Sequence, residues 1–477
     1  MLITKKAVYK KKKYKLPPSP PKLPFIGNLH QVASLTLHSL RALSMKHGPL
    51  MLLHIGQIRT FVVSSAEMAQ EILKKQDDIF ASRPSVKADN ILGYGASNVS
   101  FAPYGEYWKR AKKLYIAHLL GPAKVRSFKP AREDQVRFVL EKMRQAQKMS
   151  KSVDLTEVFN LFAVGILGRL VSKNFSEEHL VLELTKQGAA LYFEFNFEDY
   201  FPPLRFLDTF LQYESKLTNI SKRCDDLFEK MISDRKNRSA QDDKKHDGDL
   251  IGALLSLQEN GELDFELTKE HIKAFLLDMF AAGVHTTSRT LEWAMVELMK
   301  DHKTMKQIQE QVRKIPIGGR GIITNEDINE LTVLKSVIKE TLRLHPPGPV
   351  AVPHQSTQET CINGYTIPKG SRFLVNIWSI NRDPKFWENS DEFRPERFTG
   401  NTADFWGNNF QFIPFGAGRR MCPGIHFAMH NIELLLANIL YHFDWKLPNG
   451  MTTEELDMEY APGLSVMRNK KLHLVPN

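Results

Sequence analysis

The pattern of apolar and polar residues near the N-terminus predicts a β-hairpin. Apolar and β-branched side chains dominate residues 50–56 and 60–65, and a short turn separates the two runs. Ser64 and Glu67 then have the spacing of a capping box, which predicts that a helix follows at once. From there to about residue 300 the apolar positions recur mostly with helical spacing, so helix is expected to exceed strand by far.

The longest helical pattern covers residues 267–301, contains no proline and has Thr268 as its predicted N-cap. At about 1.5 Å per residue, this helix would span about 50 Å and cross a whole domain. Small and hydroxyl-bearing residues occupy its middle, and Gly283 among them predicts a kink or bulge. These residues either leave room for a ligand on one face or mark a locally irregular core helix.

The rest of the pattern predicts one large domain, mainly α with a small β part. Residues 235–249 are charged and polar, which predicts a surface loop. After Pro346, short apolar segments alternate with Gly and Pro turns, and a last long helix follows Cys422. No repeat or linker interrupts residues 25–477, although 477 residues would allow two or three domains. Residues 1–24 form a basic, proline-rich leader.

The basic excess is confined to the N-terminal part of the chain. The net charge is +11, and eleven Lys and Arg residues precede the first acidic residue, Glu67. A nucleic-acid-binding protein is expected to have a basic body, so that class is disfavoured. The lysine-rich leader is either a solvated tail or a segment attracted to an anionic membrane surface, and a removed anchor would leave the same pattern.

The apolar runs and the cysteines limit the class of protein further. No run of 18 apolar residues is present, so no membrane span is expected. The three cysteines, Cys224, Cys361 and Cys422, lie far apart and form no C-x-x-C pair. This arrangement disfavours a disulfide framework or a structural zinc site, and it fits a reducing compartment that faces the cytosol.

The stretch FGAGRRMCPG, residues 415–424, places Cys422 directly before a proline and a predicted helix. Unpaired N–H groups and the positive end of the helix dipole favour the thiolate at such a position. The neighbouring glycines would let a flat, bulky group approach the sulfur. On these local features alone, a reactive thiolate and a small buried side chain on a loop both remain open.

The wider pattern F-x-x-G-x-R-x-C-x-G has a chance frequency of about 10⁻⁴ per chain. It resembles the haem-binding signature of the cytochrome P450 family, and residues 25–477 resemble the plant microsomal subgroup of that family. The resemblance implies a haem b cofactor with Cys422 as the axial iron ligand, whose thiolate favours O–O cleavage. It also implies that Arg420 pairs with a haem propionate, and that the cofactor is bordered by Phe415, Gly416, Gly424 and Gly283.

Two expected propionate partners depart from the family pattern. The W-x-x-x-R motif appears as Trp108 followed by Lys112, and the position after Pro353 that usually holds Arg is His354. Each residue keeps a possible donor for a propionate, but neither keeps the two-pronged geometry of Arg. Reduced haem affinity is therefore expected, although haem should still bind.

An E-T-L-R sequence places Glu340 and Arg343 on one face of a predicted helix, and a P-E-R-F sequence places Arg397 further along the chain. Pairs with this spacing are common on exposed helices and carry no weight alone. The resemblance implies a buried Glu340–Arg343–Arg397 network that supports the loop carrying the thiolate. Loss of one member of such a network costs about 3–5 kcal/mol.

The middle of the long helix resembles the family motif A-G-x-[DE]-T-[TS], in which Thr286 would be the hydroxyl that steadies dioxygen and helps to deliver protons. The acidic position of the motif holds His285 instead. A histidine can relay protons, but its charge and its ordinary pKa near 6.5 differ from those of a carboxylate. Arg289, one turn on, would disfavour the imidazolium form. We therefore expect oxygen activation that is slower, that releases more peroxide, or that leads to an unusual reaction.

The expected function is an oxygen-dependent monooxygenase that acts on a lipophilic small molecule. The plant subgroup points to terpenoids, alkaloids or phenylpropanoids. No dinucleotide fingerprint is present, so electrons are expected from NADPH–cytochrome P450 reductase, with residues 109–113 (KRAKK) as a candidate contact, at the cytosolic face of the endoplasmic reticulum. The expected substrate-binding residues are Phe275, Met279, Ala282, Val350, Val352 and Leu464.

Two alternatives stay open at this point. One is a haem-dependent isomerase or dehydratase that does not use dioxygen, which His285 makes conceivable. The other is a haem-binding protein without catalytic activity. Thr286 favours the monooxygenase, because neither alternative requires a hydroxyl group there.

Overall fold

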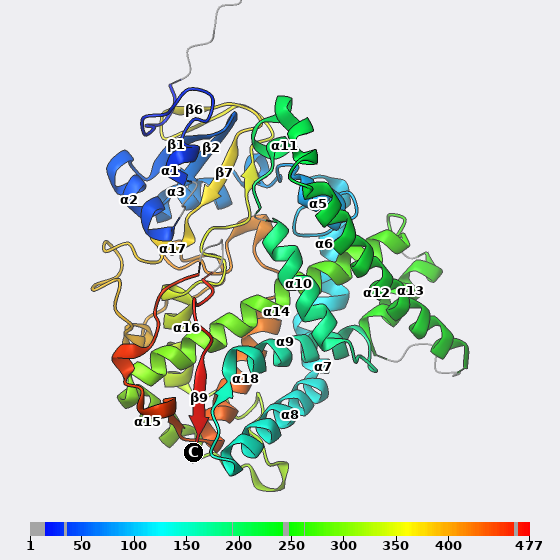
Figure 1. Cartoon of the computed structure of the whole chain (residues 1–477), viewed down its shortest axis with the longest axis vertical. Helices are drawn as coiled ribbons and strands as arrows, with labels where there is room; N and C mark the ends of the chain where they lie inside the picture. Colours follow the sequence, from blue (N-terminus) through cyan, green and yellow to red (C-terminus); the bar gives the residue numbers. More distant parts are fainter. Residues whose placement is uncertain (1–14, 33–35, 193, 242–247, 262, 462–465) are drawn as a thin grey trace, which may run out of the picture.

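The computed structural model describes residues 15–32, 36–192, 194–241, 248–261, 263–461 and 466–477, with side chains of residues 238–241 excepted. Helices make up most of the molecule, and the strands form small groups near one end and along one side (Figure 1). This arrangement confirms the predicted single domain that is mainly α with a small β part.

The α-helices are α1 (Leu29–Val32), α2 (Leu37–His47), α3 (Ala66–Gln70), α4 (Asp77–Phe80), α5 (Lys87–Leu92), α6 (Glu106–Tyr115), α7 (Pro122–Ser127), α8 (Lys129–Lys148), α9 (Leu155–Val171), α10 (Glu178–Tyr192), α11 (Phe197–Tyr200), α12 (Tyr213–Gln241), α13 (Leu250–Asn260), α14 (Lys269–Lys300), α15 (His302–Val312), α16 (Thr332–Leu344), α17 (Ile377–Ile380) and α18 (Ile425–His442). Short π or 3₁₀ segments that matter below are η1 (Glu71–Lys75), η3 (Pro202–Thr209), η5 (Pro395–Phe398) and η6 (Gly418–Arg420).

The predicted hairpin is confirmed as β1 (Leu50–Ile55) and β2 (Ile58–Val63). It belongs to a four-stranded sheet in the order β1-β2-β7-β4, in which β2 and β7 (Arg372–Val375) run parallel. Phe61 and Phe373 face each other in the register and stack with ring centres 5.0 Å apart. The other strands are β3 (Val153–Asp154), β4 (His354–Gln355), β5 (Thr360–Ile362), β6 (Tyr365–Ile367), β8 (Trp445–Lys446) and β9 (His473–Pro476).

Two local predictions are wrong in detail. The helix after the hairpin is capped by Ser65, not Ser64, because the Ser65 side chain accepts the Met68 N–H at 3.3 Å. Helix α12 continues to residue 241, where the charged composition predicts a loop from residue 235. The helix extends there because the buried Arg235 forms a 3.0 Å ion pair with Asp249, which anchors a segment that reads as solvent-exposed from composition alone.

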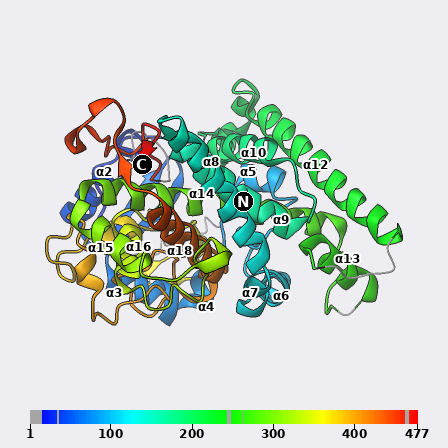
Figure 2. The ribbon, with the colours of Figure 1, turned by 90° about the horizontal axis from the view of Figure 1, so that it is seen from below.

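Helix α14 crosses the molecule between helices on both sides, as Figures 1 and 2 show. Thr268 caps its N-terminus as predicted, and the His271 side chain completes a capping box. The predicted irregularity at Gly283 is not present as a bulge, since all 32 residues are α-helical. A Cβ atom on Gly283 would lie 2.8 Å from Leu167 Cδ1, so the glycine instead permits α9 to pack closely against α14.

The described part of the proline-rich segment lies along the small β structures. The Lys15 carbonyl accepts the Thr366 N–H at 2.8 Å, and the Pro18 carbonyl accepts the Leu52 N–H at 2.8 Å. Pro17 and Pro20 are buried there. Among the described residues, no helix combines the length and the apolar character that crossing a membrane requires.

Candidate functional site

The loop that carries Cys422 is closed by its own backbone. The Cys422 N–H donates to the Phe415 carbonyl at 2.9 Å, and the Gly416 N–H donates to the Ile413 carbonyl at 2.9 Å. The chain then enters α18, with Gly424 as its N-cap residue. Burial raises the pKa of the Cys422 thiol, whereas the hydrogen bond from the Gly424 backbone and the nearby Lys112 ammonium favour the thiolate.

Glycine is required at one turn of this loop. Gly418 has φ = +69°, and a Cβ atom there would lie 1.8 Å from the Leu73 carbonyl oxygen in η1. Any side chain would therefore push the loop away from η1. Gly416 also has a positive φ of +71°, but the space around a Cβ atom there is open. The predicted cofactor-facing position of Gly416 is compatible with that space. A Cβ atom on Gly283 would meet Leu167 of α9, and its role beside the cofactor stays a prediction.

Buried cationic side chains gather beside the loop. The Arg420 guanidinium donates to the carbonyls of Ala81 at 2.7 Å and Val99 at 3.1 Å, also to that of Ala102, and lies 4.1 Å from the Trp108 ring centre. Burial, together with the charge of Arg83, lowers the pKa of Arg420 to about 8. Neither arginine has an ion-pair partner among the described residues, which leaves positive charge available for an anionic ligand.

The other predicted propionate partners are engaged within the protein. Trp108 Nε1 donates to the Val99 carbonyl at 3.0 Å, and Lys112 Nζ donates to the Arg419 carbonyl. His354 uses Nδ1 for the Phe80 carbonyl at 2.9 Å. Burial, Arg83 and Arg420 hold the pKa of His354 well below its ordinary value, so the neutral ring has no second N–H to donate.

Arg83 is a site residue that the sequence analysis missed. Its Nε donates to the Ser100 carbonyl at 3.0 Å, and its Nη1 donates to the carbonyls of Val352 at 2.7 Å and Pro353 at 2.9 Å. Burial lowers the pKa of Arg83 to about 10. The sequence around Arg83 carries no signal of this role, because the three carbonyls come from two distant segments.

Asp278 is a second missed residue. The Val99 and Ser100 N–H groups donate to Asp278 Oδ2 at 2.6 Å and 3.1 Å, which fastens residues 99–100 to α14. Burial raises the pKa of this carboxyl to about 6, against the effect of those hydrogen bonds. The signal was present in the sequence: a lone acidic residue interrupts the apolar stretch FLLDMF of the long helix.

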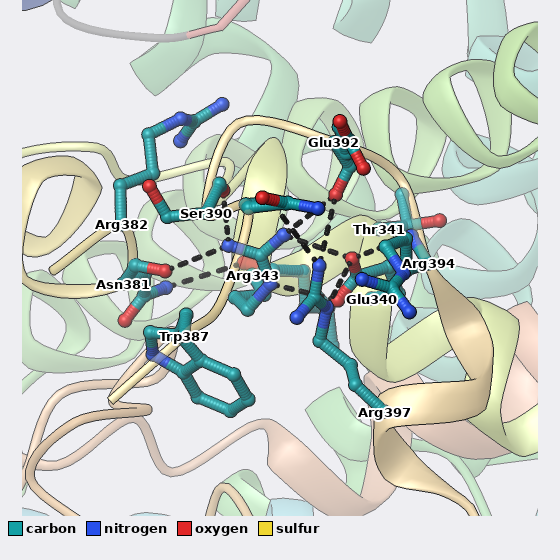
Figure 3. Close-up of polar contacts among 12 residues, drawn as sticks. Glu340, Thr341, Arg343, Asn381, Arg382, Trp387, Ser390, Glu392, Arg394 and Arg397 are labelled. Carbon is teal, nitrogen blue, oxygen red and sulfur yellow. Dashed lines mark hydrogen bonds and ion pairs between the residues drawn. The ribbon is translucent and has the colours of Figure 1, made fainter. Parts of the chain in front are cut away.

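The predicted network of Glu340, Arg343 and Arg397 is assembled in the core (Figure 3). Glu340 accepts from Arg343 at 2.7 and 2.8 Å, and its Oε1 also accepts from Arg397 Nε at 2.9 Å and from the Arg394 N–H at 2.8 Å. Glu340 and Arg343 are both 0% exposed. Every oxygen of this buried carboxylate therefore has a charged partner.

The network reaches the segment that precedes the cysteine loop. Arg343 Nη1 donates to the carbonyls of Asn381 at 3.0 Å and Ser390 at 2.7 Å. The Asn381 side chain in turn accepts the Ile413 N–H at 3.3 Å. Trp387, under the Arg343 guanidinium in Figure 3, donates Nε1 to the Gln411 carbonyl at 3.1 Å. The ion pairs on α16 thus position residues 411–413, directly ahead of the cysteine loop.

The centre of α14 is exposed on one face, unlike most of the helix. Ala281, Ala282 and Thr286 are exposed, whereas 21 residues of this helix are buried. The Thr286 hydroxyl donates to the Ala282 carbonyl at 2.6 Å, so it stays on the face of these small residues. This exposed face on a central helix marks where the described residues supply no packing partner.

His285 lies beside that face as a neutral group. Its Nε2 is buried and has no hydrogen-bond partner within the described ranges of the chain. Burial, with contributions from Arg289 and Lys186, lowers the pKa of His285 to about 4. The predicted influence of Arg289 is confirmed in direction. At neutral pH this position therefore carries no charge, in contrast to the carboxylate of the motif.

The predicted substrate-binding residues do not share one environment. Phe275 and Met279 are buried in the core, and Phe275 packs edge-on against Tyr115 at 5.9 Å. Ala282 and Val352 are exposed, the latter at 37%. Val350 packs beside the cluster that contains β1 and β2. Leu464 lies outside the described residues.

Comparisons with known proteins agree with this geometry. Residues 17–475 match the cytochrome P450 family. The chain is 44% identical to indole-2-monooxygenase of Zea mays over 471 residues, which cover 96% of this chain and 87% of that protein. It is 43% identical to premnaspirodiene oxygenase of Hyoscyamus muticus over 468 residues, 97% of this chain and 92% of that protein. A solved zebrafish cytochrome P450 with progesterone has the same fold, with a TM-score of 0.77 at 24% identity over 92% of this chain and 99% of that one.

The chain therefore belongs to the cytochrome P450 family. It is a P450 monooxygenase, and its cofactor is haem with thiolate-ligated iron. The described residues fit that cofactor. The thiol of Cys422 lies in a glycine-lined loop and can bind iron. The exposed face of α14 at Ala282 and Thr286 has no packing partner among these residues. The charges of Arg83 and Arg420, which have no ion-pair partner there, suit two propionates.

Proposed function

We propose that this chain oxidises a lipophilic plant specialised metabolite, such as a terpenoid, alkaloid or phenylpropanoid, with Cys422 as the iron ligand. The observation that carries the proposal is the cysteine loop, in which the bond between Cys422 N and Phe415 O and the start of α18 present one thiol. Haem bound there supplies the iron that activates dioxygen. Both relatives named above are called oxygenases, which supports this reaction over an oxygen-independent one.

The residues of the chain contribute position and proton delivery. Arg420 and Arg83 would hold the propionates, and the Glu340 network would keep the thiolate loop in place. The Thr286 hydroxyl, now bonded to the Ala282 carbonyl, can rotate to pass a proton across the bare face of α14. His285 would act in this relay as a neutral imidazole, with its unpaired Nε2 as donor or acceptor.

The reduced carbon-monoxide spectrum of Cys422→Ser tests the ligand. Loss of the thiolate-type absorption is expected for this variant, whereas Cys224→Ser and Cys361→Ser should keep it. Consumption of oxygen and NADPH with reductase, dependent on a lipophilic substrate, is expected only for the proteins that retain the spectrum. An unchanged spectrum and unchanged turnover in Cys422→Ser would refute the proposal.

The proposal includes the surface of the endoplasmic reticulum as the location, and two apolar segments support it. The segment of η3 exposes Phe206 at 61% and Phe210 at 80%, and the N-terminal segment exposes Phe25 at 92%. The N-terminal segment and α11, which directly precedes η3, both contact the β1–β2 turn, because Gly56 N donates to Ile26 O and Gln57 N donates to Tyr200 O. Phe206→Ser with Phe210→Ser should reduce flotation with phosphatidylcholine vesicles, whereas Phe138→Ser, an exposed change on α8, should not.

The proposed electron donor is NADPH–cytochrome P450 reductase, through α6. Lys113 and Lys109 are exposed there, while Lys112 turns inward to the Arg419 carbonyl. Lys109 already pairs with Glu106 at 2.7 Å, which leaves Lys113 as the freest charge of the KRAKK stretch. Lys113→Glu should raise the reductase concentration at half-maximal turnover about threefold, more strongly at low salt. If the reductase concentration at half-maximal turnover does not change at low salt, Lys113 is not part of the contact with the reductase.

A further inference from the structure

Arg289 extends the exposed face of α14 with a charge that has no counter-ion among the described residues. Ala282, Thr286 and Arg289 follow the spacing i, i+4, i+7 and therefore share one face of the helix. The single polar contact of Arg289 among the described residues is a weak one, from Nη2 to Met467 Sδ at 3.9 Å. Burial lowers the pKa of Arg289 to about 10, against the effect of Glu292.

The nearest acidic group is engaged elsewhere. Glu292 accepts the Thr156 hydroxyl at 2.6 Å and faces Arg468 Nη1 at 3.9 Å. In the described parts of the chain, no carboxylate comes within the 4.0 Å ion-pair distance of Arg289. A partly buried guanidinium that lacks such a partner is costly for the protein alone. This free-energy cost decreases when a ligand places an anionic group beside the Arg289 guanidinium.

Two further groups stand on the same side. The buried Nε2 of His285 has no partner, and Lys186 on α10 lies close enough to disfavour a charge on His285. Lys186 is exposed and forms no ion pair in the part of the chain that the structure describes. His285 lies three residues after Ala282 and four before Arg289, so the imidazole stands next to the face that these residues share. Lys186 lies on α10, which packs against α14.

We propose that Arg289, assisted by Lys186 and His285, binds the carboxylate of an amphipathic substrate whose apolar body lies over Ala282 and Thr286. The inference rests on the proposed function, because it narrows the substrates of that site to lipophilic carboxylic acids. Arginine is suited to this task, since its planar group binds both carboxylate oxygens. A neutral alcohol or ester of the same shape leaves the guanidinium without its anion.

The test compares acids with their methyl esters on the full-length holoenzyme. Cinnamic, lauric and abietic acids, each paired with its methyl ester, represent three apolar bodies of different shape. Affinity is measured by equilibrium dialysis and, independently, by the shift of the haem Soret band. At least one acid is expected to bind about tenfold more tightly than its ester.

Substitutions then test whether Arg289 causes the preference for the acid over its ester. Arg289→Leu should reduce the acid-to-ester ratio to about 2 or less, while ester affinity stays within about twofold. Arg59→Leu removes an exposed arginine at the β1–β2 turn and should leave the ratio unchanged. Arg289→Lys should retain part of the preference. Lys186→Met, at an exposed position, should lower the ratio about threefold and serves as the test if Arg289→Leu does not fold.

Two results would overturn the inference: no acid preferred over its ester by the wild-type protein, or a preference that survives Arg289→Leu unchanged. Equilibrium dialysis measures ligand binding directly, and it requires neither reduction of the protein nor oxygen. An acid preference can therefore be established even if turnover with reductase fails, and a failed preference leaves the Cys422 test intact. The two proposals are thus judged by separate measurements.

Discussion

The Glu340 network on α16 and the centre of α14 both bury polar side chains, but they differ in how those groups are satisfied. In the first region, each oxygen of Glu340 accepts from charged donors, and Arg343 donates to three carbonyls within residues 381–392. In the second, His285 Nε2 has no hydrogen-bond partner among the described residues, and the one polar contact of Arg289 there is with the Met467 sulfur. A saturated network stabilises the fold, whereas unsatisfied groups are places where a ligand contributes binding energy.

The contrast predicts different consequences of mutation. Substitutions in the saturated region should damage the folded protein and its haem content. Substitutions at the centre of α14 should leave the fold intact and change chemistry or ligand choice. The following predictions test that division, from the largest expected effect to the smallest.

Glu340→Ala should cost about 3–5 kcal/mol of folding free energy, because two buried guanidinium groups lose their anion. Haem content per protein and the thermal unfolding midpoint are the measurements, and both should fall sharply. Glu396→Gln is the matched control, since Glu396 belongs to the same P-E-R-F sequence and forms only a surface pair with Arg394. Normal haem content in Glu340→Ala would show that the Glu340 network is not needed to hold the cofactor site together.

Arg420→Leu should cost about 2–3 kcal/mol, because three carbonyls lose a charged donor. Haem retention on dilution and unfolding in urea are the readouts, and faster loss of haem is expected. The neighbouring Arg419→Leu provides the control, since that side chain is half exposed and pairs with Asp77 at 3.1 Å. Equal effects of the two variants would show that the buried cation cluster has no special role in holding the cofactor.

Thr286→Ala should leave stability nearly unchanged and lower the fraction of NADPH that yields oxidised product about tenfold, with more peroxide released. The control is Thr290→Ala, whose hydroxyl donates to the Thr286 carbonyl at 3.0 Å in the same i−4 geometry. Product and peroxide are quantified against NADPH consumed. Unchanged coupling in Thr286→Ala would remove this hydroxyl from the proton path.

His285→Asn should have the smallest effect, visible only in acid. The pKa of His285 lies below its ordinary value, so the unfolded chain takes up a proton before the folded chain does. Wild-type stability is therefore intact above about pH 6.5 and falls as the pH drops toward 4. Between pH 7.5 and 5.5 the wild type should lose about 1 kcal/mol relative to His285→Asn in urea unfolding. Parallel pH profiles would mean that His285 is not buried as a neutral group.

Much of the architecture was predictable from local pattern. The hairpin at β1 and β2, the N-cap at Thr268 and the helix after Cys422 follow from alternation, helical periodicity and capping chemistry, which are properties of neighbouring residues. The family signature around Cys422 was equally visible, because its residues lie within one short stretch. The error at α12 shows the limit, since one buried ion pair between Arg235 and Asp249 overrode a loop-like composition.

The environment of each side chain was decided only by tertiary structure. The close packing of Leu167 on α9 against Gly283 could not be foreseen from sequence, nor could the bond from Lys112 Nζ to the Arg419 carbonyl. Arg83 drew no attention as a site residue, and Arg289 only as a neighbour of His285, because their contacts include residues far away in the chain, Val352 and Met467. Local sequence specifies which element forms, whereas burial, charge pairing and unmet hydrogen bonds depend on which distant elements the fold brings together.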